Sequence, residues 1–209
     1  MENKNCVFIN CPFDKPRMDR ILKPILFCLL SHDLHPVLTL DIKDSGQLRI
    51  EKIVDMMKEV KYSIHDLSLL KVKKVTEFAR MNMPYELGID YGLRSSGIEE
   101  YKRKRFLVMG SKKYDYMKAI SDISGFDIMS HENSMEKVFD CMHSWLSSLE
   151  LSIIVKPSLA LYYDFINFNG WLYSNALDEY GEDVCKDYLE KMEMNTYKSK
   201  IEEYLNTKK

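Results

Sequence analysis

The chain has 209 residues, of which 45% are hydrophobic and 30% are charged, and its formal net charge is -2. A chain of this length and composition can bury one good hydrophobic core and carry one extension of modest size. A net charge so close to zero provides no strong field to attract nucleic acid, so we expect no nucleic-acid partner.

No segment has the length and apolar character of a transmembrane helix. The longest apolar run, around residues 21–30, is interrupted by Lys23 and Pro24, and it is far shorter than the ~20 residues needed to cross a bilayer. The first residues lead straight into a strand-like run, without the apolar segment of a secretory signal. We therefore expect a cytoplasmic protein with no membrane partner.

The cysteines and histidines show neither a disulfide framework nor a metal-binding pattern. There are five cysteines, an odd number, and no Cys-x-x-Cys spacing, which indicates reduced thiols. The five histidines are dispersed and form no ligand pair at helical spacing. We expect no metal site built from protein ligands.

The first part of the chain alternates short apolar runs with helical patterns. Residues 6–13 (CVFINCPF) are apolar and rich in β-branched and aromatic side chains, which predicts a buried strand ending in a loop. Apolar residues at three- and four-residue spacing predict a helix from Pro16, which Pro24 either kinks or helps to start. Residues 35–40 (HPVLTL) predict a second strand, and the Ser-Gly pair at 45–46 opens the next helix.

The same alternation continues to about residue 149. Residues 62–67 (YSIHDL) predict a third strand, and Pro84 begins a helix that runs to about Ser95. The remaining predicted elements are a strand at 105–109, a helix at 114–123, a strand at 126–129 and a helix at 134–149.

Strands that alternate with helices in this way form right-handed βαβ crossovers, which place helices on both faces of a parallel sheet. Residues 1–150 are therefore predicted to be an α/β domain with a doubly wound, five-stranded, mostly parallel sheet of the flavodoxin-like or Rossmann-like kind. Beyond it, Pro157 introduces a helix dense in aromatic and aliphatic residues, and a last amphipathic helix begins at about Glu182. We expect residues 151–209 to form a C-terminal helical appendage.

Three polar segments are expected to meet at one edge of this sheet. Ligands of open α/β sheets bind beyond the carboxyl ends of the strands, near the point at which the strand order reverses. Residues 10–14 follow the first predicted strand, residues 65–68 end the third, and residues 82–88 enter the helix before the fourth. The crevice between them is the predicted site.

Glu86 is the strongest catalytic candidate. If Pro84 occupies the first helical position, Glu86 lies in the first turn near exposed backbone N–H groups, and we expect its carboxylate to stay ionised. Such a carboxylate can attack or stabilise the anomeric carbon of a ribose as a glycosidic bond breaks. The alternative is that Glu86 only complements the helix dipole.

Asp66 is the second catalytic candidate, because it ends the third predicted strand. It is placed to bind a ribose hydroxyl or to orient a leaving base, and the alternative is a carboxylate that only caps a turn. His65 points to the opposite face by strand alternation, so we interpret it as a structural histidine.

The loops around the predicted crevice supply candidate substrate-binding residues. The cluster after the first strand can hold a phosphate or a ribose, although ordinary loop capping explains it as well. Arg49 can reach for a phosphate, and an exposed helix start is the alternative. The candidates are Asn10, Cys11, Pro12, Phe13, Asp14, Arg17, Ser45, Arg49, Ser68, Asn82 and Tyr85.

Two further features are open to a plain structural interpretation. Gly88 and Gly92 share a helix face, which favours a close approach of that helix to the sheet or to a ligand. The basic runs 71–74 and 102–105 lack interleaved aromatic residues and are interpreted as solvated loop ends, the first also as a candidate flap over the site.

The segments FINCPFD, YSIHDLS and NMPYELGIDYG together resemble the nucleoside 2-deoxyribosyltransferase and TIR-like nucleotide-binding superfamily, most closely a bacterial branch of it. The resemblance covers roughly residues 6–149. Its most specific part is the glutamate of ELG, since the deoxyribosyltransferases carry their nucleophilic glutamate in a similar context.

By this resemblance Glu86 is the nucleophile or the oxocarbenium-stabilising carboxylate, and Asp66 binds the base or the sugar. The implied activity is cleavage or transfer of an N-glycosidic bond, with NAD or another nucleotide as substrate, no cofactor, and a role in bacterial antiviral defence. One alternative is a nucleotide sensor without catalysis that signals through the C-terminal helices. Another is an interaction module that forms a homo-oligomer through the aromatic helix around residues 162–171.

Overall fold

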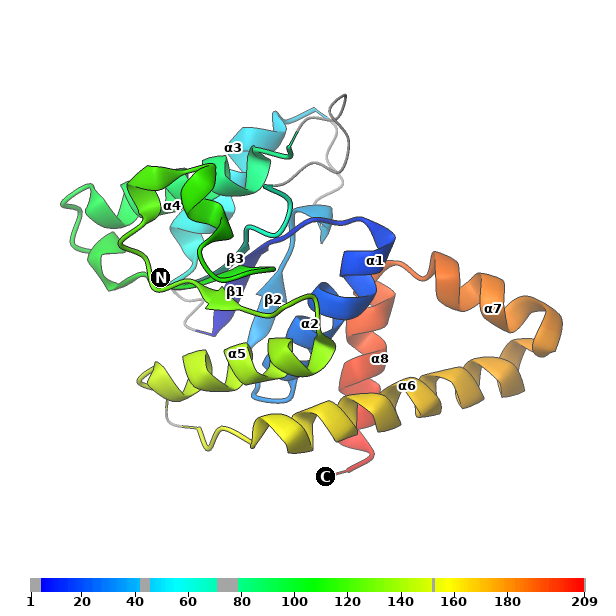
Figure 1. Ribbon diagram of the computed structural model, residues 1–209. Helices are drawn as coiled ribbons and strands as arrows, with labels where there is room; N and C mark the ends of the chain where they lie inside the picture. The colour runs from blue at the N-terminus through cyan, green and yellow to red at the C-terminus, as the bar shows by residue number, and fades with distance from the viewer. Residues whose placement is uncertain (1–4, 42–45, 71–78, 152, 209) are drawn as a thin grey trace.

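The computed structural model describes residues 5–41, 46–70, 79–151 and 153–208. A parallel sheet of five strands lies at its centre, in the order β2-β1-β3-β4-β5 (Figure 1), which confirms the predicted α/β fold with a C-terminal helical extension. The strands are β1 (Cys6–Asn10), β2 (His35–Val37), β3 (Tyr62–Asp66), β4 (Arg105–Gly110) and β5 (Met129–Ser130).

The strand order reverses direction next to β1. The chain passes from β1 to β2 on one side, and then crosses to β3 on the other side of β1. The carboxyl ends of β1 and β3 therefore flank the switch point, where open sheets of this kind bind ligands. In the register of this pair Asn10 lies opposite His65, so both residues are held at that edge.

Helices cover both faces of the sheet, as strand alternation requires. Phe8 packs on one face with residues of α3 (Arg49–Glu59), and α4 (Asn82–Ser95) covers the same side. Val7 and Ile9 face the other side, where the core includes α2 (Lys23–Leu30) and α5 (Met135–Ser148). Figure 1 shows α3 and α4 above the sheet, and α2 and α5 below it.

Pro24 is accommodated without breaking the helix that follows β1. A short helix α1 (Lys15–Arg17) leads into a π-helical turn, η1 (Met18–Leu22), in which the Lys23 N–H bonds to the Met18 carbonyl oxygen. Pro24 then lies at the start of α2, where a residue without an N–H costs little. Of the two expected alternatives, a kink at Pro24 or a position of Pro24 near the start of a helix, the structure shows the second.

Several predicted elements differ in length or type. The first strand ends at Asn10 rather than Phe13, α3 begins at Arg49 rather than at residues 45–46, and the last helix, expected from about Glu182, is divided into α7 (Glu182–Lys191) and α8 (Met194–Asn206). The second strand ends at Val37 and is followed by the 3₁₀ turn η2 (Thr39–Asp41), because the side chain of Asp41 accepts the Leu38 N–H and closes the chain there. The helix expected at 114–123 is two 3₁₀ turns, η4 (Asp115–Lys118) and η5 (Ser121–Ile123). The last strand begins at Met129 rather than Phe126. A further 3₁₀ turn, η3 (Tyr101–Arg103), precedes β4.

The C-terminal part of the chain forms three helices, of which the first and the last pack into the core of the α/β domain. The helices are α6 (Ser158–Tyr180), α7 (Glu182–Lys191) and α8 (Met194–Asn206). The ring of Phe27 in α2 lies 5.4 Å from that of Phe165 and 5.6 Å from that of Phe168, both in α6, and 6.3 Å from that of Tyr204 in α8. The boundary expected at residue 150 falls between α5 and α6, and the hydrophobic core continues across it.

Helix α7 forms the outer part of an arm that projects from the body of the protein (Figure 1). Gly181 separates α6 from α7 with a φ of 75°, a value that glycine adopts without strain. Among the described residues, no helix combines the length and the apolar composition needed to cross a membrane.

Candidate functional site

A small cavity opens beyond the carboxyl end of β1, next to the first turns of α4. Its volume is about 70 Å³, well below the roughly 300–1,000 Å³ of a site that encloses a whole small molecule. It can receive one group of a ligand, such as a sugar ring, while the rest lies across the rim. The lining residues are Ile9, Asn10, Cys11, Pro12, Phe13, Thr39, Arg49, Arg80, Asn82, Met83 and Glu86.

Glu86 lies in this cavity with only 5% of its surface exposed. The prediction that it occupies the first turn of its helix is wrong, because α4 begins at Asn82, two residues before Pro84, and Glu86 is the fifth helical residue. Backbone N–H groups of the helix start therefore do not hold it ionised. Burial raises the pKa of Glu86 to about 7, against the opposing positive charge of Arg49. Near neutral pH this carboxyl group exchanges a proton.

Two arginines line the cavity together with this carboxyl group. Arg49 is the first residue of α3 and Arg80 precedes α4, and both are exposed. Guanidinium groups form paired hydrogen bonds with phosphate and carboxylate oxygens. A ligand with an anionic group at the rim of the cavity would match the charge of the two arginines.

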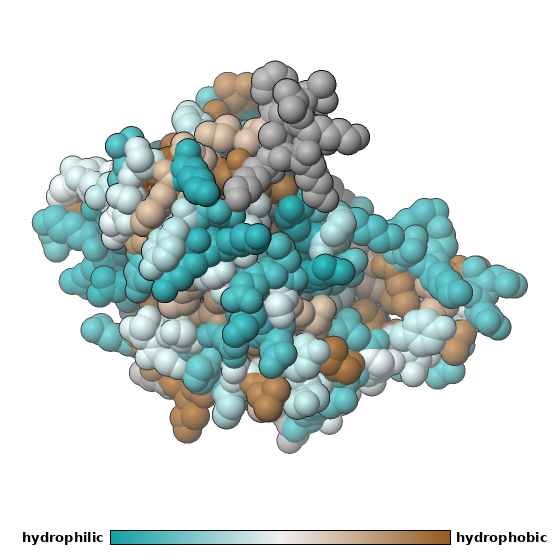
Figure 2. All heavy atoms as spheres, in the orientation of Figure 1, coloured by the Kyte–Doolittle hydropathy of each residue, from teal (hydrophilic) through white to brown (hydrophobic). Residues whose placement is uncertain are grey.

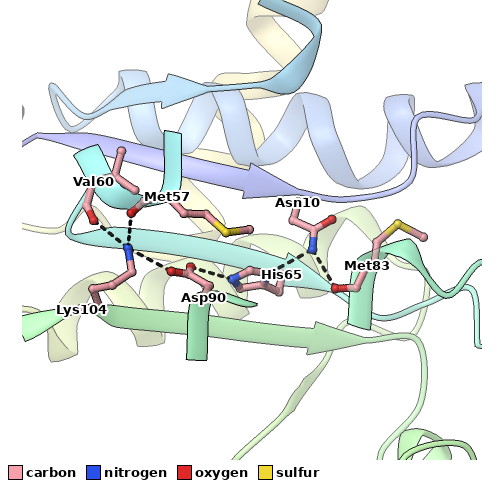
Figure 3. A network of polar contacts seen from close by, with 7 residues as sticks. All are labelled: Asn10, Met57, Val60, His65, Met83, Asp90 and Lys104. Carbon is pink, nitrogen blue, oxygen red and sulfur yellow. Dashed lines mark hydrogen bonds and ion pairs between the residues drawn. The ribbon is translucent and has the colours of Figure 1, made fainter. Parts of the chain in front are cut away.

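The side chain of Asn10, which lines the cavity, is held in place by contacts with Met83 and His65. Its Nδ2 donates to the carbonyl oxygen of Met83 at 2.9 Å and lies 3.1 Å from Nδ1 of His65 (Figure 3). Because Asn10 supplies the hydrogen of the second contact, His65 Nδ1 must accept, and the ring proton must be on Nε2. That nitrogen lies 3.1 Å from Oδ2 of Asp90, to which it donates.

The network ends at a buried ion pair. Lys104 Nζ lies 3.0 Å from Oδ1 of Asp90 and donates to the carbonyl oxygens of Met57 and Val60, as Figure 3 shows. Burial alone would raise the pKa of Asp90, but the hydrogen bond from His65 and the positive charge of Lys104 hold it below its usual value. Burial lowers the pKa of Lys104, and Asp90 opposes that change. The contacts thus form a chain that begins at the carbonyl oxygens at the end of α3, passes through Lys104, Asp90 and His65, and ends at Asn10 in the cavity wall.

Two interpretations of the sequence are corrected here. The basic run 102–105 is not uniformly a solvated loop end: Lys104 is 1% exposed, and only its neighbours face solvent. Gly88 and Gly92 are both exposed, and a Cβ atom at either position would meet nothing within 4 Å. The expected close approach of their helix face to the sheet is therefore absent.

Asp66 does not line the Glu86 cavity. It lies at the end of β3 and accepts hydrogen bonds at Oδ1 from the backbone N–H of Ser68 at 3.1 Å and from the Ser68 hydroxyl. His131 accepts the N–H of Asn133 at Nδ1, so its Nε2 carries a proton and lies 2.8 Å from Ser68 Oγ and 3.3 Å from Asp66 Oδ1. These contacts match the alternative interpretation of Asp66 as a turn carboxylate, and they place Ser68 in the same cluster.

Cys11 is surrounded by acidic groups. Its side chain is buried, and burial, together with the negative charges of Asp66, Asp14 and Glu86, raises its pKa well above the usual value. A thiol in this setting stays protonated and is a poor nucleophile. Cys11 therefore shapes the cavity wall rather than reacting.

The remaining predicted site residues divide into three groups. Asn10, Cys11, Pro12, Phe13, Arg49 and Asn82 line the cavity with Glu86. Asp14 and Arg17 pair with each other at 2.9 Å, and Tyr85 is 63% exposed; none of these three is part of the cavity wall. Ser45 and the basic run 71–74 lie outside the described residues.

Some residues of the site escaped the sequence analysis. Arg80 and Thr39 line the cavity but belong to no recognisable motif. Asp90 carried a usable signal, because it follows Glu86 by four residues and so shares its helix face. A buried carboxylate needs a partner such as a buried cation. Lys104 is that cation, but the sequence does not distinguish it from the other basic residues of the run 102–105.

Comparison of the chain with protein-family models, with curated proteins and with solved structures finds no match. Within the described ranges, no group of three or more His, Cys, Asp or Glu side chains is arranged to hold a metal ion. The fold, the cavity and the chemistry of the side chains that line it are therefore the features from which a function can be inferred.

Proposed function

We propose that this protein cleaves or transfers the N-glycosidic bond of a nucleotide at the Glu86 cavity, with NAD as the first substrate to test. One observation carries the proposal: a buried carboxyl group with a pKa of about 7 lies at the sheet edge where the strand order reverses. Carboxyl groups tuned to neutral pH by burial are typical of acid–base and nucleophilic sites.

The chemistry follows from the charge that develops during the reaction. As the base leaves with the electron pair of the C–N bond, positive charge builds up on the anomeric carbon of the sugar. The Glu86 carboxylate stabilises that charge from within a buried site, where electrostatic interactions are stronger than in water. Water or a second nucleoside then adds to the carbon, and Glu86 can accept the proton that the acceptor loses.

The shape of the site suits part of a nucleotide. The cavity of about 70 Å³ accepts the sugar ring, while Arg49 and Arg80 bind the phosphates at the rim. Asn10, fixed by Met83 and His65, presents a rigid amide to a sugar hydroxyl. A positively charged leaving group, as in NAD, would also favour the ionised form of Glu86.

The second candidate is a nucleotide sensor without turnover. The observation that favours it is the exposed pair Arg49 and Arg80, which can bind phosphates at the rim whether or not Glu86 acts on the sugar. Such a sensor would bind through the same arginines and leave the glycosidic bond intact.

The test is a substrate screen on the purified protein, with Glu86→Gln as the informative variant and Glu100→Gln, at an exposed position, as the matched control. Each protein is incubated with NAD, nucleosides and deoxynucleosides, and chromatography identifies any released base. Calorimetry measures binding in parallel. Turnover by the wild type and the control, lost in Glu86→Gln, supports the enzyme. Binding without turnover, unchanged in Glu86→Gln, supports the sensor.

A further inference from the structure

Helix α6 has apolar residues on two faces. The inner face packs into the core through Leu161, Phe165, Phe168, Leu172 and Ala176. The aromatic pair at 165 and 168 is thus used within the chain and cannot contact a partner. In Figure 1, α6 lies along the lower edge of the molecule, and Figure 2 shows brown, hydrophobic residues at the surface there.

The outer face carries a second, regular stripe, here called the outer stripe. Its members follow each other at alternating intervals of four and three residues, the spacing of the a and d positions of a coiled coil. Five of them are large side chains with 39% to 59% of their surface exposed. The outer stripe consists of Leu159, Tyr163, Ile166, Gly170, Tyr173, Leu177 and Tyr180.

A surface helix normally shows a charged face opposite its buried one. Over its 23 residues α6 contains no lysine or arginine and three acidic residues. Asp164 is engaged by the Tyr204 hydroxyl and by Lys208. Asp178 and Glu179 lie in the last turn, away from the middle of the outer stripe.

We propose that a second copy of this chain covers the outer stripe, with the two α6 helices antiparallel about a two-fold axis near Gly170. The spacing is nearly symmetric about this residue. It places Ile166 of one copy opposite Tyr173 of the other, and Tyr163 opposite Leu177. A two-fold axis makes the same patch serve both partners, as in most homodimers.

Charge selects the antiparallel direction. In that arrangement Asp178 and Glu179 of one copy approach the α6 N-terminus of the other, where the exposed Lys156 precedes the helix. The helix N-terminus and the lysine both attract acidic side chains. A parallel pair would bring the acidic ends together and leave both lysines at the opposite end.

Gly170 supports the position of the axis. It lies in the interior of a long helix, where glycine is less favourable than alanine. A Cβ atom at this position would meet nothing within 4 Å of its own chain, so the packing of the monomer does not require a glycine. Close approach of a second helix backbone is a use for which glycine is suited.

The contact is small, so the dimer is expected to be weak. A helix of 23 residues is about 34 Å long and about 10–12 Å wide, which gives a strip of roughly 350–400 Å² on each copy. A standard stable interface buries about 800 Å² per partner. Association should therefore depend on concentration, in the micromolar range or weaker.

Sedimentation equilibrium tests the proposal, with Ile166→Asp as the informative variant and Asn167→Asp as its control. Both variants place the same charge on exposed positions of α6, but only the first alters the outer stripe. We expect wild type and Asn167→Asp to dimerise alike, and Ile166→Asp to associate at least about tenfold more weakly. Circular dichroism confirms that both variants are folded. A wild type that is monomeric up to about 1 mM, or equal association of all three proteins, overturns the proposal.

Disulfide trapping tests the orientation. Tyr163→Cys and Leu177→Cys are prepared as separate proteins, oxidised alone and as an equal mixture, and separated on a non-reducing gel. The antiparallel dimer predicts a covalent dimer that contains one copy of each variant and forms only in the mixture. Cross-linking of either variant with itself as efficiently as in the mixture contradicts the antiparallel arrangement.

Discussion

Glu86 and Asp90 lie one turn apart on the buried side of α4, yet the pKa values of their carboxyl groups are shifted in opposite directions. Burial alone would raise the pKa of Asp90, but the contacts of His65 and Lys104 lower it. Glu86 faces the cavity, where burial outweighs the charge of Arg49 and raises its pKa to about 7. The helix thus carries one structural anion and one carboxyl group that exchanges a proton near neutral pH.

The rate of glycosidic cleavage should rise with pH across neutrality. Only ionised Glu86 can stabilise positive charge on the sugar, and with a pKa of about 7 its ionised fraction grows from about one tenth at pH 6 to about nine tenths at pH 8. We expect kcat/KM to increase by close to a factor of ten over this interval. Initial rates measured across it check the prediction. A rate that does not change with pH would mean that Glu86 has no role in the reaction. A rate that falls as pH rises would mean that Glu86 acts as a general acid.

The raised pKa of Glu86 also predicts a stability effect of defined sign. The folded state binds this proton more tightly than the unfolded chain does, so its stability falls as pH rises from about 4.5 to about 7. Glu86→Gln removes the ionisation. It should therefore stabilise the protein at pH 8 by on the order of 2–3 kcal/mol, and by much less below about pH 5. Urea unfolding at both pH values measures the difference. A variant that is less stable than wild type at pH 8 would contradict the assigned pKa shift.

Removing Lys104 should be strongly destabilising. Lys104→Met leaves the carboxylate of Asp90 buried without its cation, which typically costs about 3–5 kcal/mol. The double variant Lys104→Met/Asp90→Leu removes both charges and should recover part of that loss. Lys102→Met, at an exposed position two residues away, is the control and should unfold like the wild type. Chemical denaturation of the wild type and the three variants measures these differences in stability, and a Lys104→Met variant as stable as the wild type would show that the pair is not ionised.

The C-terminal helices should be necessary for folding. Phe168 is fully buried against Phe27, so Phe168→Ala should destabilise the protein by about 3–5 kcal/mol. Asn167→Ala, at an exposed neighbouring position, should have little effect. A chain that ends at Leu149 would expose the same core surface and should be insoluble or unfolded. Thermal unfolding of the two variants and recovery of the truncated chain test this. A soluble, cooperatively folded truncation would identify residues 151–209 as an independent appendage.

The fold class was accessible from the sequence because each buried strand is a short apolar run between helical patterns. The order of the strands in the sheet could not be predicted in the same way, since it depends on which strands lie next to each other in the folded protein. Because side chains alternate along a strand, His65 and Asp66 were also correctly predicted to point to opposite faces of the sheet. The helix expected at 114–123 failed because Tyr114 adopts a φ of 66°, which a helical pattern does not reveal.

The candidate site was predictable in outline but not in its electrostatics. Glu86 was singled out because Pro84 was expected to place it in the first helical turn and because of its ELG context; it lies in the second turn but does line the cavity. Its protonation was predicted wrongly, because pKa depends on burial and on charges brought close only by folding. Asp66 was expected in the same crevice, but a turn and the contact with His131 hold it in a separate cluster.

The most direct test of the central claim compares the rates at which wild type, Glu86→Gln and Glu100→Gln release the base from NAD at pH 8. Loss of a carboxylate that acts in the transition state should reduce the rate by at least about a thousandfold. The account predicts that loss for Glu86→Gln, with an unchanged rate for Glu100→Gln. Equal base release by wild type and Glu86→Gln would contradict it.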